Sequence, residues 1–384
     1  MNSCQPLITR RHFGAGAVSA TLALGACATP SALVGPQLTT NCPLPVHVRR
    51  ERLIRELVGL RPYRESGFVV RREALGAKNL VHNYGHGGAG ITLSWGTSKL
   101  ATGLGLPGHE GAVAIVGAGI IGLTTARLVQ EAGFPATIYA AALPPETTSN
   151  IAGAGWYPSS LFKREALTPD FQRQMDAALR FAYRRFQLMT GPEYGVRWMK
   201  QYEIYKTPAP TGPKSWFTSM METGFLPEVR ELNPGEHPFG KTYVRQYTGM
   251  VIETERLLRQ LLRDFQMAGG KVVVRKFNSS TELSSLSERL IFNATGLGSR
   301  MLFGDTSLRP MRGQLAVLLP QPEVDYSLSH EGGFYMFSRT DGIVLGGTNE
   351  LDDWNLTPDP ATTERLLRGH QQIFSTFRCN GLRS

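Results

Sequence analysis

The fold predicted from this sequence rests on one stretch, Val113-Ala114-Ile115-Val116-Gly117-Ala118-Gly119-Ile120-Ile121-Gly122. Its first four residues form an apolar run, which is typical of a strand buried on both faces of a parallel sheet. Residues 123–132 then have helical spacing with Gly133 as a stop, and residues 136–139 form a second short β-rich run. We therefore predict a strand–turn–helix–strand unit.

The three glycines of this stretch predict a dinucleotide site. Gly117 permits the tight turn, Gly119 lets the backbone approach a pyrophosphate, and Gly122 lets the helix pack closely on the strand. The pyrophosphate charge would then lie against free N–H groups at the helix N-terminus. An acidic residue that binds the ribose usually follows about 20 positions later. This chain has Ala140-Ala141-Ala142 there, so we expect backbone, water or another segment to hold that ribose.

Length and composition fit an α/β enzyme. The chain has 384 residues, enough for two closely joined domains, and its 42 glycines indicate many tight turns. The formal net charge is +10, but the basic residues are scattered, so we expect no nucleic-acid partner. The four cysteines form no CxxC pair, which argues against a zinc site or a redox dithiol. Cys42 and Cys379 could form a disulfide in an oxidising compartment, but the sequence alone does not establish this pair.

The N-terminal residues have the order of an export signal. Arg10-Arg11 precedes a small and apolar run at 14–26 that is too short for a permanent transmembrane helix. Paired arginines are typical of twin-arginine export, so residues 1–30 are predicted to be a signal and 31–45 a Pro/Thr-rich tether. Cys27 lies either at a lipidation site, which would anchor the protein to a membrane, or next to a plain cleavage site. We expect a periplasmic or extracellular protein.

Longer motifs on both sides of this unit resemble the D-amino-acid oxidase family. One signature of that family matches Val81-His82-Asn83-Tyr84-Gly85-His86-Gly87-Gly88-Ala89-Gly90-Ile91-Thr92. Its second flavin segment is similar to Thr147-Thr148-Ser149-Asn150-Ile151-Ala152-Gly153-Ala154-Gly155-Trp156. Shorter matches are Gly59-Leu60-Arg61-Pro62, Asn293-Ala294-Thr295-Gly296, Arg312-Gly313-Gln314 and Tyr335 through Gly346-Gly347. The resemblance implies an α/β fold: a glutathione-reductase-like, Rossmann-type FAD domain with an interleaved substrate domain built on an antiparallel sheet.

The order of these motifs differs from the usual order of that family. In the family the dinucleotide fingerprint opens the chain and the His-Asn-Tyr-Gly segment closes it, whereas here residues 46–100 come first. We interpret this as a circular permutation with residues 101–111 as the linker between the old ends. A deletion with duplication is the alternative, and the absence of a second His-Asn-Tyr-Gly copy argues against it. FAD-binding segments are then expected at residues 112–195 and 249–306, and substrate-domain segments at 196–248 and 307–384.

By resemblance, three residues would hold the substrate. Arg61 would bind a carboxylate through its guanidinium fork, Tyr335 would add a hydrogen bond, and the carbonyl of Gly88 would accept from the amine. Some family members have a further tyrosine where this chain has Glu331, so the substrate pocket is expected to differ. The two histidines of the long signature are not assigned as a base, because the family passes hydride from the α-carbon of a neutral amine to flavin N5.

The resemblance also implies a set of residues that bind FAD without a covalent bond. They lie in the glycine turn, the two long motifs and three later positions: Gly117, Ala118, Gly119, Ile120, Gly122, Thr147, Thr148, Ser149, Gly153, Ala154, Gly155, Phe277, Thr295, Gly296, Gly87, Gly88, Ala89, Gly90, Ile91 and Thr92. A helix is expected over Gly249–Ala268 and a strand over Lys271–Val274. The region 196–227, with Tyr202, Tyr205 and Trp216, is expected on the substrate side.

The implied activity is FAD-dependent oxidative deamination of an amino acid or small amine, with molecular oxygen reduced to hydrogen peroxide. Two alternatives stay open. One is a dehydrogenase that passes electrons to a membrane carrier, which a lipid anchor would suit. The other is a catalytically inactive flavin-binding protein, against which the presence of both Arg61 and Tyr335 argues. The side chain and the enantiomer of the substrate are not predicted.

Overall fold

The predicted strand before the glycine turn lies inside a mainly parallel sheet. The computed structural model describes residues 42–153, 155–209 and 211–379. Val113–Val116 forms strand β4, and all four of its side chains are buried because helices and loops cover both faces of the sheet. The six-stranded sheet has the order β2 (Val69–Leu75), β3 (Lys78–Tyr84), β10 (Leu290–Asn293), β4, β5 (Ala136–Ala140) and β9 (Lys271–Val274). The edge strand β2 runs antiparallel to β3, and the other described pairs are parallel.

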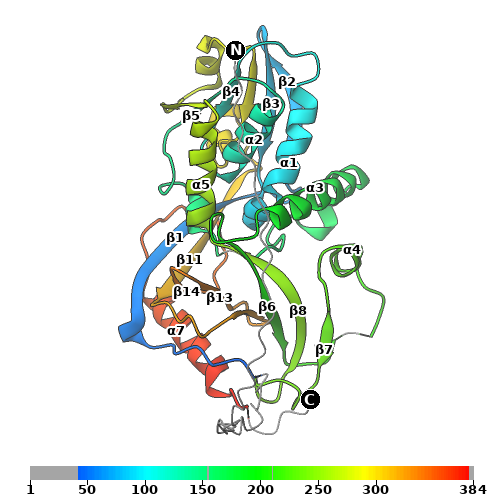
Figure 1. Ribbon diagram of the computed structural model, residues 1–384, viewed down its shortest axis with the longest axis vertical. Helices are drawn as coiled ribbons and strands as arrows, with labels where there is room; N and C mark the ends of the chain where they lie inside the picture. Colours follow the sequence, from blue (N-terminus) through cyan, green and yellow to red (C-terminus); the bar gives the residue numbers. More distant parts are fainter. Residues whose placement is uncertain (1–41, 154, 210, 380–384) are drawn as a thin grey trace, which may run out of the picture. The chain divides into compact units, whose positions relative to one another are not determined.

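Four helices pack around this sheet (Figure 1). The glycine turn leads into α2 (Ile120–Glu131), which contacts both α1 (Gly90–Gly105) and α5 (Thr254–Met267). Helix α3 (Pro169–Leu188) packs on α1, and its N-terminus is capped because the Thr168 side chain accepts from the Phe171 N–H. These contacts bury a shared core that fixes the turn between β4 and α2.

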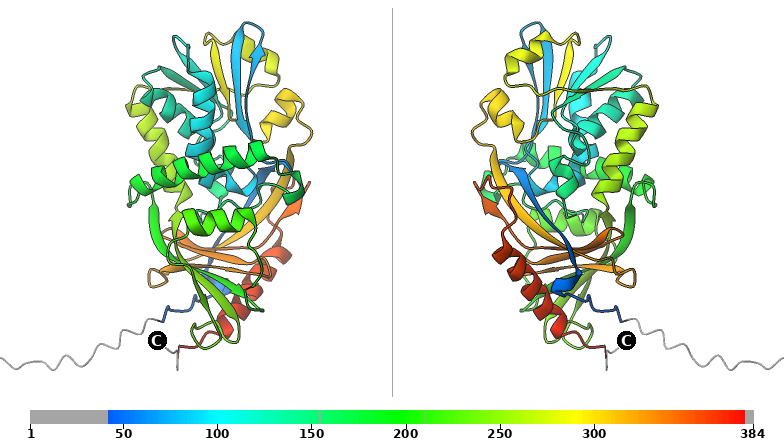
Figure 2. Two further views of the ribbon diagram at one scale, coloured as in Figure 1. Left: turned by 90° about the vertical axis from the view of Figure 1, so that its right-hand side faces the viewer. Right: turned by 90° about the vertical axis from the view of Figure 1, so that its left-hand side faces the viewer.

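A second sheet lies across from the first, and the two sheets line a common cavity. Its nine strands are β1 (Leu53–Tyr63), β11 (Arg309–Leu318), β14 (Gly342–Gly346), β13 (Tyr335–Arg339), β12 (Tyr326–His330), β6 (Val196–Tyr205), β8 (Tyr243–Ile252) and β7 (Arg230–Leu232) in that order, with β15 (Glu350–Leu351) paired to β11. The pairs are antiparallel except that β12 and β6 are parallel. Helix α7 (Pro360–Ser375) contacts β11 and β14 (Figure 2). Two short helices, α4 (Trp216–Gly224) and α6 (Gly298–Phe303), complete the fold.

The predicted segment 46–100 contributes to both sheets. Its first strand, β1, is an edge of the nine-stranded sheet, while β2 and β3 belong to the six-stranded sheet. Strand β3 pairs with β10 along Asn79–His82, so the segment is part of the central fold.

Two predicted boundaries are corrected by the structure. Residues 101–105, expected in a linker at 101–111, belong to α1, which continues to Gly105 and packs closely there: a Cβ atom on Gly105 would lie 2.8 Å from the Phe292 ring. The helix expected from Gly249 begins at Thr254, because residues 249–252 continue β8 and the apolar side chains of Val251 and Ile252 are buried. The strand predicted over Lys271–Val274 is confirmed.

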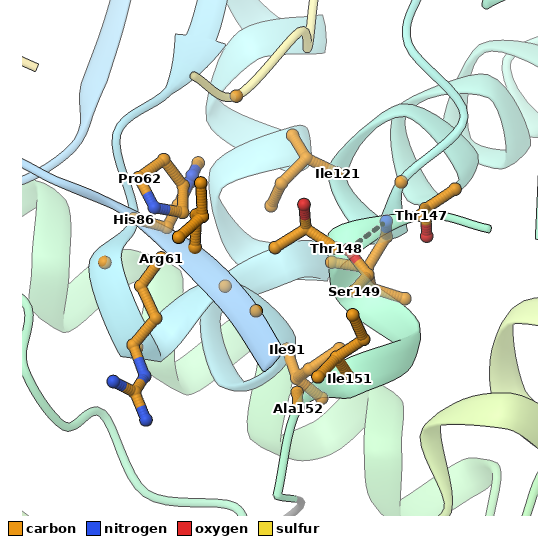
Figure 3. A pocket seen from close by; sticks show the side chains of 18 of the residues that line it. Arg61, Pro62, His86, Ile91, Ile121, Thr147, Thr148, Ser149, Ile151 and Ala152 are labelled. Atoms are coloured by element: carbon orange, nitrogen blue, oxygen red, sulfur yellow. Dashed lines mark hydrogen bonds between the residues drawn. The ribbon is translucent and has the colours of Figure 1, made fainter. Parts of the chain in front are cut away.

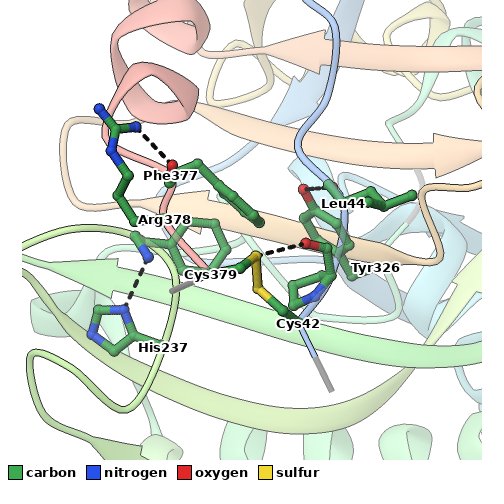
Figure 4. The surroundings of a disulfide bond; sticks show 9 residues. Cys42, Leu44, His237, Tyr326, Phe377, Arg378 and Cys379 are labelled. Carbon is green, nitrogen blue, oxygen red and sulfur yellow. Dashed lines mark hydrogen bonds between the residues drawn. A yellow bond between two sulfur atoms is a disulfide. The ribbon is translucent and has the colours of Figure 1, made fainter. Parts of the chain in front are cut away.

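A disulfide joins the two ends of the described chain (Figure 4). Cys42 and Cys379 have Cα atoms 5.8 Å apart, although 337 positions separate them in sequence. Nearby, the Tyr326 hydroxyl donates to the backbone oxygen of Leu44 at 2.8 Å, which fixes the first described residues on the nine-stranded sheet. No helix within the described ranges is long and apolar enough to cross a membrane.

Candidate active site

A cavity of about 850 Å³ lies between the two sheets. On one side it is lined by Val116, Tyr139 and Ala294, which lie at or just beyond the carboxyl ends of β4, β5 and β10. Gln201 and Tyr335, from strands β6 and β13 of the nine-stranded sheet, line the other side. Ligands of open parallel sheets bind in the crevice at the carboxyl ends of the strands. The cavity is therefore where the glycine turn would hold a dinucleotide.

The glycine turn has the geometry that its sequence predicts. Gly117 has a φ of +114°, and a Cβ atom there would lie 2.4 Å from the backbone oxygen of Ala294. A side chain at this position would therefore be both strained and obstructed. Gly119 is the N-cap of α2 and has no side chain with which to cap it. The N-terminus of α2 thus faces the cavity, with the Ile120 N–H bound by Ser149 and the positive end of the helix directed at a ligand.

The second predicted flavin segment lies against the start of α2 (Figure 3). The Ser149 Oγ accepts from the Ile120 N–H at 3.0 Å, and Thr147 Oγ1 donates to Asn150 Oδ1 at 2.7 Å. Thr147, Thr148 and Ser149 all line the cavity. The two motifs, which the resemblance assigned to one cofactor, are therefore adjacent in space.

Most of the residues predicted to bind FAD line this cavity. They are Gly117, Ala118, Gly119, Ile120, Thr147, Thr148, Ser149, Gly153, Gly155, Phe277, Thr295, Gly296, Gly87, Gly88, Gly90, Ile91 and Thr92. Gly122 lies within the first turn of α2, away from the cavity lining, where its missing side chain lets the backbone of Gly117 approach. Ala89 is fully buried in the core and does not line the cavity. Ala154 lies outside the described residues.

Arg61 and Tyr335 come together at the side of the cavity formed by the nine-stranded sheet. Arg61 Nη2 lies 3.5 Å from the Tyr335 hydroxyl, and Nη1 donates to the Thr348 backbone oxygen at 3.2 Å and to Asn349 Oδ1 at 3.0 Å. Figure 3 shows the Arg61 side chain directed away from Thr148 and Ser149. The arginine is thus held in place while part of its guanidinium faces the cavity.

Two glycines of the nine-stranded sheet make room for this pair. A Cβ atom on Gly313 would lie 2.5 Å from Arg61 Nη2, and one on Gly346 would lie 2.1 Å from the Tyr335 ring. Tyr335 and Gly346 face each other in the β13–β14 pair. Any larger residue at either position would displace the polar groups that face the cavity.

Gly88 lies beside the same cavity in a short 3₁₀ turn that precedes α1. Its N–H donates to the Ser160 backbone oxygen at 3.1 Å. The neighbouring His86 is buried at the edge of the cavity lining, its Nε2 lies 3.0 Å from Thr97 Oγ1, and burial lowers its pKa to about 3. His82 is also buried, with its Nδ1 2.9 Å from Asn293 Nδ2, and burial lowers its pKa. Both histidines are therefore neutral and structurally engaged.

The polar lining of the cavity includes atoms that a bound group would satisfy. Asn83 Oδ1, Trp156 Nε1 and Gln201 Nε2 are buried and have no hydrogen-bond partner among the described residues. Buried polar atoms are normally paired, so these three indicate that a ligand with both donors and acceptors belongs here. An FAD fits this lining, since the glycine turn suits its pyrophosphate and the cavity extends from that turn to Tyr335.

Sequence reasoning missed several residues of the cavity. Tyr157, Glu203 and Tyr247 line its substrate side, and Glu146 lines the end near Ala140–Ala142. Glu146 immediately precedes the predicted flavin segment, and this adjacency could have indicated that it lines the cavity. Of the expected substrate-side residues, Tyr202 lines the cavity, whereas Tyr205 and Trp216 lie outside its lining. Within the described ranges, His, Cys, Asp and Glu side chains form no group of three or more that suits a metal ion.

Comparisons with known proteins agree with this geometry. The family model described as FAD dependent oxidoreductase (DAO) matches residues 36–104 and 112–383. The D-amino-acid oxidase of Dictyostelium discoideum is 31% identical over 273 residues, which cover 69% of this chain and 74% of that protein. The D-amino-acid oxidase of Rubrobacter xylanophilus is 31% identical over 261 residues, which cover 66% of this chain and 74% of that protein.

The fold is shared with a solved oxidase. The crystal structure of iminodiacetate oxidase from Chelativorans sp. BNC1 matches with a TM-score of 0.52 at 16% identity, covering 69% of this chain and 79% of that one. At this identity the match bears on the fold alone. The family match over most of the sequence, together with the 31% identity to the Dictyostelium discoideum protein, shows that this chain belongs to the DAO family of FAD-dependent oxidoreductases.

Proposed function

We propose that the protein catalyses FAD-dependent oxidative deamination of an amino acid. The observation that carries this proposal is the contact between Arg61 and Tyr335 at a cavity whose other end is the glycine turn. A guanidinium and a phenol at one point of a cavity form a site for a carboxylate, because together they offer charge-assisted and neutral hydrogen bonds. The D-amino-acid oxidases named above are consistent with such a substrate.

When bound, FAD supplies the acceptor for a hydride from the substrate's α-carbon. The chain's own residues then position the substrate. Arg61 binds the carboxylate, Tyr335 donates a second hydrogen bond to it, and the backbone carbonyl of Gly88 accepts from the amine. Because each group is fixed by a packed strand or turn, the α-carbon is oriented without further rearrangement.

No side chain of the long signature is needed as a base. The His86 pKa of about 3, caused by burial, makes its imidazole a weak base at neutral pH. The nitrogens of His82 face Asn293 and Glu73, at 2.9 Å each, and lie away from the cavity lining. The substrate amine is therefore expected to enter neutral and to lose hydride by orientation and desolvation alone.

Molecular oxygen is the proposed electron acceptor, with hydrogen peroxide as product. The test is a panel of D- and L-amino acids incubated with the purified flavoprotein in air, with peroxide detection. Peroxide formed in proportion to the α-keto acid supports an oxidase. Keto acid formed only with an added quinone or dye acceptor identifies the dehydrogenase alternative, and no turnover with any acceptor identifies an inactive flavin carrier.

We further propose that the chain is a circular permutant within its family. The family model matches two separate segments, 36–104 and 112–383, and the short connection after α1 joins them. Cys42 and Cys379, which a disulfide links, would lie close to the ends of the rearranged domain. Permutation is tolerated where chain ends lie close together, and here a covalent bond would hold them.

We also propose that the protein is exported, so that it is periplasmic or extracellular. The paired arginines at 10–11 and the Cys42–Cys379 disulfide support this, because disulfides persist mainly outside the cytoplasm. The signal at 1–30, and with it the lipidation site at Cys27, lies outside the described residues. Cell fractionation with mass spectrometry of the mature N-terminus would test both export and the lipid anchor.

A further inference from the structure

A carboxylate faces the substrate side of the cavity and is held there by phenols. Tyr205 donates its hydroxyl to Glu203 Oε2 at 2.8 Å, and Tyr247 donates to Glu203 Oε1 at 3.3 Å. Glu203 lines the cavity, and each of its oxygens retains a lone pair after accepting one hydrogen bond. The carboxylate is therefore oriented and still able to accept from a ligand.

The strand register places Glu203 across the sheet from Tyr335, where the substrate's α-carboxylate is proposed to bind. Glu203 on β6 pairs with Ser329 on β12, and Ser329 pairs with Tyr335 on β13. Residues paired across neighbouring strands point to the same face of a sheet, so Glu203 and Tyr335 face the cavity together. Two strand separations of about 4.8 Å put them roughly 10 Å apart. This spacing suits a ligand with a carboxylate at one end and a second charged group at the end of a long side chain.

No Lys or Arg among the described residues forms an ion pair with Glu203, although Arg245 is close enough to interact with its charge. Arg245 lies opposite Glu203 in the β6–β8 pair, but its guanidinium binds Glu222 at 3.1 Å and Glu231 at 2.7 Å. The ammonium of Lys214 also binds Glu222. In the described part of the chain, no Lys or Arg nitrogen lies within 4.0 Å of the Glu203 carboxylate. A cation from the ligand would provide that contact.

Aromatic rings surround this end of the cavity. Tyr157 and Tyr247 both line it, and a cation is attracted to the face of such rings. Burial, with the Glu203 charge as the next cause, raises the pKa of Tyr157 to about 12 and that of Tyr247 well above its usual value. Both phenols therefore stay protonated and neutral at physiological pH, so they do not repel the carboxylate.

An independent observation on the same strand marks this side of the cavity as ligand-binding. Gln201 is 8% exposed, lines the cavity, and its Nε2 has no partner among the described residues. Gln201 lies two positions before Glu203 on β6, and residues two apart on a strand point to the same face, so both side chains lie on the cavity face. An acceptor of the bound cofactor or substrate is needed to satisfy this amide.

We propose that Glu203, with the rings of Tyr157 and Tyr247, binds a cationic group at the end of the substrate's side chain. This inference rests on the proposed amino-acid oxidation. It assigns the substrates to basic amino acids with long side chains, such as lysine, ornithine and arginine. The α-carboxylate lies at Arg61 and Tyr335, and the ammonium or guanidinium lies at Glu203. The opposing interpretation is that Glu203 serves only as an acceptor for the two phenols, in which case it would not influence substrate choice.

The experiment measures kcat/KM of the FAD-loaded protein for matched pairs of substrates. Lysine is compared with 2-aminoheptanoic acid and arginine with citrulline, each as both enantiomers, so that the length of the side chain is kept while its charge changes. The variants are Glu203→Gln, which keeps the shape of the side chain but only one of the two oxygens that accept from the tyrosine hydroxyls, and Glu231→Gln as the control. Glu231 is a neighbouring acidic residue that binds Arg245, but it does not line the cavity. Flavin content and thermal unfolding are recorded for each protein.

The unaltered protein is expected to prefer the charged member of each pair by about 10- to 100-fold, the effect of one charge-assisted hydrogen bond. Glu203→Gln should reduce that preference by a similar factor, whereas Glu231→Gln should change it by less than about threefold. Equal efficiency for arginine and citrulline in the unaltered protein would overturn the inference without the need for any variant. So would a preference that survives Glu203→Gln.

The same experiment separates this inference from the proposed function. Turnover of neutral amino acids without any charge preference leaves amino-acid oxidation standing and rejects the role of Glu203. Failure of every amino acid, of either enantiomer, to reduce the bound flavin rejects the proposed function, and the assignment of Glu203 falls with it.

Discussion

Arg61 Nη2 lies 3.5 Å from the hydroxyl oxygen of Tyr335, although 274 positions separate the two residues in sequence. Arg61 belongs to β1 and Tyr335 to β13, and β11 and β14 lie between these strands in the sheet. The contact spans that gap because Gly313 on β11 and Gly346 on β14 carry no side chains to block it. The sheet thus forms a polar site from distant parts of the chain.

Replacing Tyr335 with Phe should weaken substrate binding moderately. The change removes one neutral donor and keeps the ring, so the expected loss is about 0.5–1.5 kcal/mol, or about two- to tenfold in kcat/KM. FAD content should be unchanged. Steady-state kinetics checks this, and a loss of more than about a thousandfold would mean that the hydroxyl has a role in the chemical step.

Replacing Gly119 with Ala should weaken FAD binding without unfolding the protein. The backbone at Gly119 is extended, with φ −70° and ψ −179°, and an added Cβ would approach only Ser149 Oγ, at 3.1 Å. The methyl group would, however, occupy space at the cavity, which should raise the Kd for FAD about 10- to 100-fold. Titration of the apoprotein with FAD measures this.

Gly103→Ala is the matched control for that substitution. Gly103 lies in α1, and nothing lies within 4 Å of an added Cβ. Its Kd for FAD should stay the same, while the helix gains about 0.5–1 kcal/mol. Equal FAD affinity in the two variants would show that the backbone at Gly119 does not approach the cofactor.

Acidification should destabilise the protein in part through His86. Burial lowers its pKa in the folded protein to about 3, whereas the unfolded chain binds a proton near the ordinary pKa of about 6.5. As the pH falls below about 6.5, the unfolded state therefore binds more protons, and the free energy of unfolding decreases. Between about pH 7.5 and about pH 5 the contribution of His86 should be about 2 kcal/mol.

Comparison with His86→Gln isolates this effect, because glutamine stays neutral and can still bond to Thr97. Denaturant unfolding at the two pH values should show the stability difference between the proteins shift by about 2 kcal/mol in favour of the variant at the lower pH. A difference that does not change with pH would mean that His86 is accessible to protons in the folded state.

The predictions from sequence were most successful where the signal is local. The apolar run of β4, the glycine turn and β9 agree with the structure because each follows from residues adjacent in sequence. The start of α5 was missed because Glu253, its N-cap residue, makes no side-chain capping bond. Its carboxylate accepts instead from the Thr340 N–H at 2.9 Å, a contact that no local pattern reveals.

The substrate side of the cavity was the least predictable part. Residues 201–205 alternate as expected for a strand, but an alternating pattern does not tell whether the face of Glu203 meets solvent or a cavity. Its partners Tyr205 and Tyr247 are on two different strands, and Arg245 is engaged by acids on two other elements. Arg61 and Tyr335 could be paired beforehand only through the family resemblance.

The first segment should be indispensable to the fold. A chain that begins at Gly111 lacks β1, β2, β3 and α1, which exposes β10 as an open edge and removes Arg61. Expressed alone, residues 111–384 should lose bound FAD and stability together, as measured by absorbance and thermal unfolding. A soluble, flavin-loaded fragment would contradict the permutation.

A rearranged chain provides the matched control. It begins at Gly111 and carries residues 42–110 after Cys379 through one inserted glycine, because the two residues to be joined have Cα atoms 5.8 Å apart and a direct peptide bond spans about 3.8 Å. If the chain is a permutant, this order should restore FAD content and turnover. An insoluble or colourless product would indicate that the present order is required for folding.

The most direct test of the central claim is anaerobic reduction of the bound flavin by amino acids in the unaltered protein and in Arg61→Ala. At least one amino acid should bleach the flavin of the unaltered protein. Arg61→Ala should keep its FAD content and melting temperature but lose about 3–5 kcal/mol of substrate stabilisation, a fall of about two to nearly four orders of magnitude in the second-order rate constant. Arg61→Lys should recover only part of this loss, because an ammonium cannot reproduce the guanidinium fork. If Arg61→Ala is reduced by amino acids as fast as the unaltered protein, the carboxylate is bound elsewhere and the account of the site is wrong.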